Sequence, residues 1–208
     1  MSESLPAMIS DVEELDELLS RPTDQAIRTL SNLPGDVMLL GAGGKMGPTL
    51  ARMCRRASDA ADTSRSIIAV SRFSRQETVE SLQAGGIDVL RGDLLDPTFV
   101  NTLPPVPHVI FMVGVKFGTS SDTSATWAMN AYVPGVVAQH FHGSRIVAFS
   151  TGNVYPLVPH DSTGSKEADP PGPIGEYAMS ALGRERIFAW FCRQQKTPTA
   201  LLRLNYAC

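Results

Sequence analysis

The chain has 208 residues, of which 43% are hydrophobic and 19% are charged, and 18 Lys and Arg against 21 Asp and Glu give a formal net charge of −3. This balance argues against a nucleic-acid-binding surface, and the apolar content excludes a wholly disordered chain. The apolar runs are far shorter than the roughly 20 residues of a membrane helix. Its cysteines, Cys54, Cys192 and Cys208, show no metal-ligand spacing. We expect a cytoplasmic protein with neither a membrane nor a nucleic acid as partner.

Residues 1–34 predict a helical arm ahead of the main domain, which we place at residues 35–208. Ser10 and Glu13 have capping-box spacing, and apolar residues then recur at helical intervals until Arg21-Pro22 interrupts them. A second short helix is expected at residues 24–30, before a turn that ends at Gly35.

From Asp36 onward, short runs rich in Val and Ile alternate with longer amphipathic stretches. These runs are mostly not alternating, which is typical of parallel strands buried on both faces. The sequence therefore predicts an α/β fold with a Rossmann-type, doubly wound parallel sheet. The expected strands are 37–40, 66–70, 88–90, 109–113, 145–150 and 200–204, and the expected helices are 46–57, 76–84, 124–139 and 177–194.

A glycine-rich turn directly follows the first predicted strand and opens the next helix. Its residues are Gly41, Ala42, Gly43, Gly44, Lys45, Met46 and Gly47. Glycines at such a place allow a tight turn and let the backbone approach a diphosphate, which the helix N-terminus then attracts. The turn therefore predicts dinucleotide binding; the alternative is a tight turn that binds nothing.

The second predicted strand ends at Ser71-Arg72, where a dinucleotide-binding fold commonly has a carboxylate for the adenosine ribose. An arginine there can instead bind a 2′-phosphate with paired hydrogen bonds. We therefore expect NADP to be favoured over NAD, with Arg75 as a second contributor. The alternative is an ordinary surface arginine.

Residues 155–175 predict a loop that contains five prolines, Pro156, Pro159, Pro170, Pro171 and Pro173. A loop of this length within a compact domain is usually functional, often on the substrate side. His140 and His142 lack acidic or thiol neighbours that would complete a metal site, so no metal is expected.

Several further motifs lie at the expected ends of strands and on the helices. They are Gly92-Asp93-Leu94, Val113-Gly114-Val115-Lys116, Asn130, and Ser150-Thr151-Gly152-Asn153-Val154-Tyr155. With the GxxGxxG spacing of Gly41, Gly44 and Gly47, the chain resembles the extended short-chain dehydrogenase/reductase family, in particular its NAD-dependent epimerase/dehydratase branch. The resemblance covers residues 36–206.

The resemblance implies roles along the cofactor. It assigns Asp93 to the adenine with Leu94 packed beside it, and it places Val113 and Gly114 at the nicotinamide end. Lys116 resembles a lysine that some sugar-nucleotide epimerases use on the cofactor, although a solvated lysine is an equal alternative. Asn130 matches a helix asparagine, which needs hydrogen-bond partners if it is buried.

The resemblance also implies the catalytic residues. Thr151 falls on the family's Ser/Thr position with Ser150 beside it, and Tyr177 matches the tyrosine base of the YxxxK motif. Ala181 stands where the lysine of that motif belongs. A phenol with a pKa near 10 is a poor base at neutral pH, and each pKa unit left uncorrected costs about 1.4 kcal/mol.

Three cations are candidates to replace this lysine. Lys116 is the preferred one, and Lys166 in the proline-rich loop is a more distant choice. Arg184 lies seven residues after Tyr177 on the same helix face. For Arg184, with Glu185 and Arg186, we favour a solvated face.

The family's C-terminal substrate lobe would begin after the last predicted strand, so we expect the chain to be a fragment of a longer enzyme. A homodimer is a further implication of the resemblance. The leading hypothesis is an NAD(P)-dependent oxidoreductase or epimerase for a hydroxyl-bearing small molecule, plausibly a nucleotide sugar. The rival hypothesis is an NAD(P)-binding sensor or scaffold without turnover.

Overall fold

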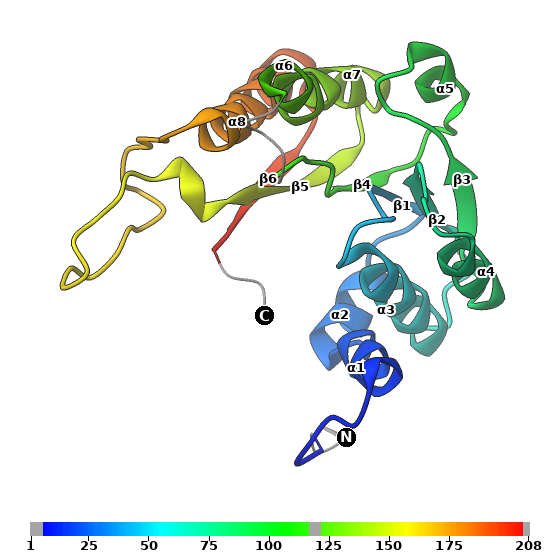
Figure 1. Ribbon diagram of the computed structural model, residues 1–208. Coiled ribbons are helices and arrows are strands. Elements are labelled where there is room, and N and C mark those ends of the chain that lie inside the picture. The colour runs from blue at the N-terminus through cyan, green and yellow to red at the C-terminus, as the bar shows by residue number, and fades with distance from the viewer. Residues whose placement is uncertain (1–5, 117–121, 206–208) are drawn as a thin grey trace. The chain divides into compact units, whose positions relative to one another are not determined.

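The computed structural model describes residues 6–116 and 122–205. Within it the chain forms two compact units, Met1–Leu90 and Arg91–Cys208. The elements of both are shown in Figure 1.

The first unit carries three neighbouring strands in the order β3-β2-β1. They are β1 (Val37–Leu40), β2 (Ile67–Ser71) and β3 (Asp88–Arg91), and the helices are α1 (Val12–Leu19), α2 (Asp24–Ser31), α3 (Gly47–Ala60) and α4 (Gln76–Ala84). All four residues of β1 are buried, and β1 pairs with β2 in parallel, which explains their unbroken apolar runs.

The second unit carries the strand order β4-β5-β6, with both pairings parallel. Its strands are β4 (His108–Phe111), β5 (Arg145–Thr151) and β6 (Thr199–Leu204), and its helices are α5 (Pro97–Thr102), α6 (Thr123–Trp127), η1 (Ala128–Tyr132), α7 (Val133–His140), η2 (Gly152–Val154) and α8 (Glu176–Gln195). The rings of Phe111 on β4 and Phe188 on α8 meet edge to face at 5.2 Å in its core.

The predicted strands and helices are confirmed with small shifts at their ends, but three details of the prediction are wrong. The capping residue of α1 is Asp11, whose side chain accepts from the Glu14 backbone, and not Ser10. The predicted helix at 124–139 is interrupted by the π-helix η1. The short helix α5 was not expected; it begins where Asp96 caps Pro97, a favourable first helical residue.

The proline-rich segment is a loop, as predicted, and Figure 1 shows it in yellow as a long excursion between η2 and α8. The backbone N–H of Gly172 donates to the carbonyl of Val154 at 3.0 Å. Because this bond closes residues 154–172 into a loop, the exposed residues between its ends, which include Leu157 and Val158, extend from a closed base.

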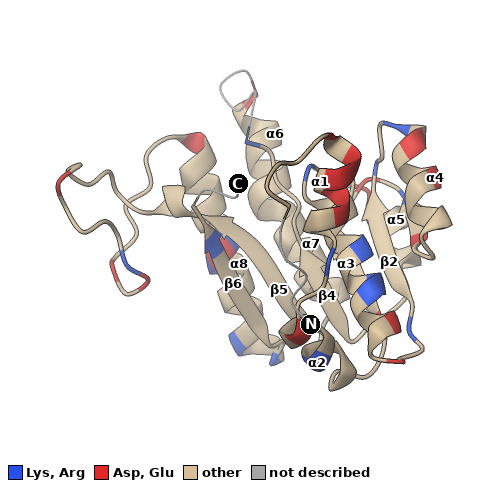
Figure 2. Cartoon of the chain, turned by 90° about the horizontal axis from the view of Figure 1, so that it is seen from below, with Lys and Arg blue, Asp and Glu red and all other residues tan. Residues whose placement is uncertain are grey.

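The arm helix α1 packs against α3 through charged side chains, seen in Figure 2 as the acidic face of α1 beside basic residues of α3. Arg56 binds both carboxylate oxygens of Glu17 at 2.8 and 2.9 Å and also donates to Ser20 Oγ at 2.9 Å. The hydrogen bond from Arg56 lowers the pKa of Glu17. Arg52 adds a second ion pair to Asp16 at 3.2 Å. The arm is therefore attached by polar contacts more than by burial.

In the described parts of the chain, the structure has no helix that is long and apolar enough to cross a membrane.

Replacing Arg56 with Ala is expected to loosen the arm and lower the free energy of unfolding by about 0.5–1 kcal/mol, because both partners are partly exposed. Hydrogen exchange of the α1 amides should accelerate in Arg56→Ala. In the control Arg55→Ala, whose ion pair stays within α3, α1 should exchange at the wild-type rate. Equal exchange of α1 in Arg56→Ala and wild type would contradict this attachment.

Candidate functional site

The glycine turn after β1 is held at both ends and exposed in its middle. The backbone N–H groups of Gly41 and Ala42 donate to the carbonyl of Val70, at 2.9 and 3.1 Å, which ties the turn to the end of β2. Gly41 has a φ of 89°, a conformation that side chains rarely tolerate. Residues 43–46 are exposed, whereas Gly47 is buried. The segment between these anchors is thus exposed, while the N–H of Gly44 donates to the carbonyl of Gly41 at 3.2 Å within the turn.

Gly47 and Gly43 permit close approaches that a side chain would prevent. A Cβ on Gly47 would lie 2.2 Å from the carbonyl oxygen of Ala42, so glycine lets α3 begin directly against the turn. A Cβ on Gly43 would lie 2.7 Å from Ser71 Oγ, so the turn passes beside the end of β2. No side chain caps the N-terminus of α3. This backbone fits the diphosphate of a dinucleotide, which a helix N-terminus attracts.

The end of β2 carries Ser71, Arg72 and Phe73. Ser71 adjoins Gly43, Arg72 is exposed, and Phe73 is buried with a φ of 44°. Ser71 and Arg72 therefore lie on the same side of the first unit as the turn, where the sequence predicted contacts to the adenosine ribose. Lys45 and Met46 are exposed in the turn itself.

Asp93 and Leu94 follow β3 in the second unit. The Asp93 carboxylate accepts from the backbone N–H of Leu95 at 3.0 Å, and Leu94 is buried. The adenine contact assigned to Asp93 stays a prediction.

Asn130 is fully buried, and its amide group makes four hydrogen bonds. Its Nδ2 donates to the carbonyl of Val115 and to Ser180 Oγ, both at 3.0 Å. Its Oδ1 accepts from the backbone N–H of Val115 at 2.8 Å and from Arg184 Nη2 at 3.2 Å. The paired bonds to Val115 fix the segment after β4, which contains Val113, Gly114 and the exposed Lys116. The partners that a buried asparagine requires are thus present.

Asn130 lies within the π-helix η1, a rare conformation that often marks functional sites. η1 packs against α8. A π-helical turn contains more residues than an α-helical turn, so it changes which side chains face α8. Asn130 and Ala131 are the buried residues of this π-helix.

Thr151 ends β5, and its hydroxyl accepts from the backbone N–H of Asn153 at 3.2 Å and donates to Asn153 Oδ1 at 3.3 Å. Tyr177 is half-buried in the first turn of α8, a helix that packs against β5 and η2. The elements that carry the two predicted catalytic groups are therefore in contact. Ala181 is 1% exposed, so the position of the family lysine lies inside the protein.

The prediction of a solvated face for Arg184 and Glu185 is wrong, because both are buried, although Arg186 is exposed. Arg184 donates from Nη1 to the carbonyl of Phe149 at 2.7 Å and contacts Asn130 through Nε and Nη2. Burial lowers the pKa of Arg184 to about 10, which still leaves it charged at neutral pH. The sequence did contain a signal: Ala181, Arg184 and Phe188 form one helical stripe.

The carboxylate of Glu185 has hydrogen-bond partners on two strands, β5 and β6. It accepts from Ser150 Oγ at 2.6 Å and from Arg203 Nε and Nη2 at 2.9 and 2.7 Å. Arg203 also donates to the hydroxyl of Tyr155 at 2.7 Å. The predicted catalytic neighbour Ser150 therefore orients the end of β5 through Glu185, and Glu185, Arg203 and Tyr155 were not among the predicted site residues.

The remaining candidates, Lys166, His140 and His142, lie outside this hydrogen-bond network. Lys166 is exposed in the loop. His140 Nε2 and His142 Nδ1 each contact a backbone carbonyl, of Leu103 and Gln139 respectively. Among the described residues, no group of three or more His, Cys, Asp or Glu residues could hold a metal ion.

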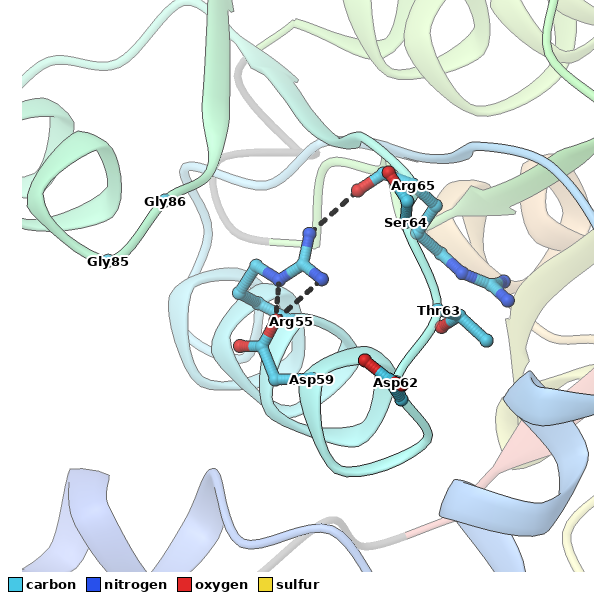
Figure 3. Close-up of a pocket in the computed structure, with 8 residues that line it drawn as sticks. All are labelled: Arg55, Asp59, Asp62, Thr63, Ser64, Arg65, Gly85 and Gly86. Carbon is cyan, nitrogen blue, oxygen red and sulfur yellow. Dashed lines mark hydrogen bonds and ion pairs between the residues drawn. The ribbon is translucent and has the colours of Figure 1, made fainter.

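A polar pocket of about 660 Å³ lies elsewhere in the first unit, near the end of α3 and the turn after α4. Figure 3 shows Arg55 bound to Asp59 and to the carbonyl of Arg65, whose guanidinium points away from them. Its lining residues are Arg55, Asp59, Asp62, Thr63, Ser64, Arg65, Gly85 and Gly86. None of them is a predicted site residue.

Two alanine substitutions separate the roles of the glycines in the turn. Gly47→Ala is expected to lower the free energy of unfolding by about 1–3 kcal/mol, because its Cβ would overlap the Ala42 backbone. Gly44→Ala should change it by less than about 0.5 kcal/mol, since its Cβ would lie 3.5 Å from the nearest atom. Thermal unfolding measures both; equal losses would contradict the close approach at Gly47.

Comparison with solved structures shows the fold. UDP-glucuronic acid 4-epimerase from Bacillus cereus, solved with NAD, is 16% identical with a TM-score of 0.65, and the match covers 82% of this chain and 56% of that one. The UDP-Glc/GlcNAc 4-epimerase from Campylobacter jejuni is 16% identical with a TM-score of 0.69, over 82% and 53% of the two chains. DesIV, a dTDP-glucose 4,6-dehydratase from Streptomyces venezuelae solved with NAD and TYD, is 18% identical with a TM-score of 0.72, over 81% and 55%.

The chain therefore spans about half the length of these structures. Their likeness confirms the predicted Rossmann-type α/β fold. Comparison with curated protein sequences gives no match. The family model of the NAD dependent epimerase/dehydratase family matches residues 37–207. That match spans both units and includes the glycine turn, Asn130, Thr151 and Tyr177. The chain thus belongs to the NAD dependent epimerase/dehydratase family, as its motifs predicted.

Proposed function

We propose that the chain is the dinucleotide-binding part of an NAD(P)-dependent enzyme that oxidises or epimerises a hydroxyl-bearing carbon of a nucleotide sugar. The observation that carries the proposal is the retention of Thr151 and Tyr177 on packed elements within a family of NAD-dependent enzymes. The three structural neighbours are named for nucleotide-sugar substrates, which supports that substrate class.

In this proposal the exposed backbone of residues 43–46 holds the cofactor diphosphate, and Ser71 and Arg72 lie toward the adenosine ribose. A nicotinamide cofactor bound there would accept the hydride from the substrate carbon. Tyr177 removes the proton of the substrate hydroxyl as general base. Thr151 turns its hydroxyl proton from Asn153, whose accepting oxygen is 3.3 Å away, toward the substrate oxygen. Asn130 holds Val115 and thereby the segment that carries Lys116.

The second candidate function is a cofactor-binding sensor or scaffold without turnover. Ala181 is the observation that favours it, since the lysine that assists the tyrosine is replaced by a buried methyl group. Retention of both Thr151 and Tyr177 favours the enzyme, because a silent binder needs neither hydroxyl group.

Turnover separates these two functions. In the presence of NAD and a panel of UDP- and dTDP-sugars, the wild-type full-length enzyme that contains this chain is expected to convert a substrate. Tyr177→Phe in that enzyme is expected to lose roughly 100-fold or more of the rate, since general base catalysis contributes about 10²–10⁴-fold. Both proteins should bind NAD equally in a fluorescence titration. Binding without conversion by the wild type would favour the sensor or scaffold.

The choice between NAD and NADP depends on Arg72. If its guanidinium binds a 2′-phosphate, Arg72→Ala should weaken NADP binding by about tenfold or more while NAD affinity barely changes, as expected for the loss of a charge-assisted bond. Arg28→Ala is the matched control, because it removes the same charge from an exposed position of α2. An NAD-preferring wild type whose affinities do not respond to Arg72→Ala would refute the NADP assignment.

A further inference from the structure

The turn that carries Thr151 connects the end of β5 to the proline-rich loop. It runs from Ser150 to Tyr155 and contains the short helix η2. Thr151 Oγ1 accepts from the backbone N–H of Asn153 at 3.2 Å, so the place of this oxygen depends on the conformation of the turn. Its proton points to Asn153 Oδ1, but the two oxygens are 3.3 Å apart, which is long for such a bond. The oxygen is therefore fixed by the turn, while its proton is free to reach another acceptor.

Arg203 on the neighbouring strand β6 holds both ends of this turn. Its Nη1 donates to the Tyr155 hydroxyl at 2.7 Å, and its guanidinium lies over the Tyr155 ring, 4.8 Å from the centroid. Its Nε and Nη2 donate to Glu185, whose Oε1 also accepts from Ser150 Oγ at 2.6 Å. The guanidinium thus reaches Tyr155 directly and Ser150 through Glu185.

The pair of Arg203 and Glu185 is itself held firmly. The side chain of Glu185 is 3% exposed and that of Arg203 is 21% exposed. Arg203 binds both carboxylate oxygens, at 2.9 and 2.7 Å, a two-point contact with a fixed geometry. Ser150 and Arg203 are also partners in the parallel register of β5 and β6. The pair therefore provides a rigid support for the turn.

The backbone on either side of Ser150 is restricted as well. A Cβ on Gly152 would lie 3.1 Å from Asn205 Oδ1 and 3.4 Å from Asn205 Cα, so glycine lets the turn lie against the residue that follows β6. The carbonyl of Phe149 accepts from Arg184 Nη1 at 2.7 Å. Side chains from α8 and β6 thus fix the chain before and after Thr151.

We propose that Arg203 and Glu185 are positioning residues: they fix the turn from Ser150 to Tyr155 and so hold the Thr151 oxygen where its proton can meet the substrate oxygen. This inference rests on the proposed function, in which Thr151 binds that oxygen. Both residues act through the turn, so their effect falls on the rate of the reaction more than on the binding of cofactor or substrate.

Two hydroxyl deletions test the inference without breaking the ion pair. Ser150→Ala and Tyr155→Phe each remove one of the two contacts to the turn, and both leave Glu185 bound by Arg203. Glu185→Gln would instead remove a buried ion pair and much stability with it, so it does not separate positioning from folding. The decisive protein is the double variant Ser150→Ala with Tyr155→Phe.

Matched controls remove the same groups elsewhere in the second unit. Ser144→Ala deletes a serine hydroxyl that is as buried as that of Ser150, 6% exposed in both cases, and that donates to the carbonyl of Val106 just before β5. Tyr132→Phe deletes a phenol hydroxyl from an exposed position of η1. Neither control touches the turn, so both should keep the wild-type behaviour of Thr151.

The first measurement needs neither cofactor nor turnover. In the full-length enzyme that contains this chain, labelled at its threonine methyl groups, the three-bond couplings of the Thr151 methyl report its χ1 rotamer. We expect one rotamer in the wild type and in both controls, and exchange between two or more staggered rotamers in the double variant. A single wild-type rotamer in the folded double variant would overturn the inference.

The second measurement is the rate. The double variant should lose about tenfold or more in kcat while KM stays within about twofold, because misplaced reacting groups slow the chemical step. If the double variant does not fold, Tyr155→Phe alone, which removes one oxygen atom, is read in the same way. An unchanged kcat would overturn the inference even if the couplings change. A wild type that binds no NAD and converts no sugar refutes the proposed function, whereas the Thr151 couplings still decide whether Arg203 and Glu185 hold the turn.

Discussion

The hydrogen bonds that one buried side-chain amide requires, that of Asn130, connect the elements of the second unit. Asn130 is fully buried, and a primary amide without partners would cost several kcal/mol in an apolar interior. Its bonds reach the segment after β4, the start of α8 and the guanidinium of Arg184. The π-helix that carries Asn130 is therefore stabilised by tertiary bonds, and the segment leading to Lys116 takes its conformation from the same side chain.

The buried charges of Glu185 and Arg184, which are adjacent in sequence, have different kinds of partner. Glu185 forms an ion pair with Arg203, and its Oε1 also accepts a hydrogen bond from Ser150. Arg184 is surrounded by neutral acceptors and keeps an uncompensated charge. Burying ions is costly and seldom a source of stability by itself. The first arrangement holds β5, β6 and α8 together, whereas the second joins α8 to η1 and to β5.

The family model and the solved structures supply the context for these contacts. The chain has the fold and the motifs of the NAD dependent epimerase/dehydratase family, and it spans about half the length of the matched structures. Within that family pattern, Ala181 is the departure with the greatest chemical consequence. The structure replaces the interpretation of Arg184 as a surface residue with a buried cation that binds Asn130 and the carbonyl of Phe149.

The sequence by itself determined what depends on local patterns. Unbroken apolar runs predicted the parallel strands, and the glycines at positions 41, 44 and 47 predicted the turn, because a tight turn and a close helix approach leave few other residue types. Only the tertiary structure decided which polar residues are buried. The helix register places Arg184 on one stripe with Ala181 and Phe188. The partners that make the burial of Arg184 and Glu185 tolerable lie far away in the chain and become neighbours only through folding; they are Asn130, Phe149, Ser150 and Arg203.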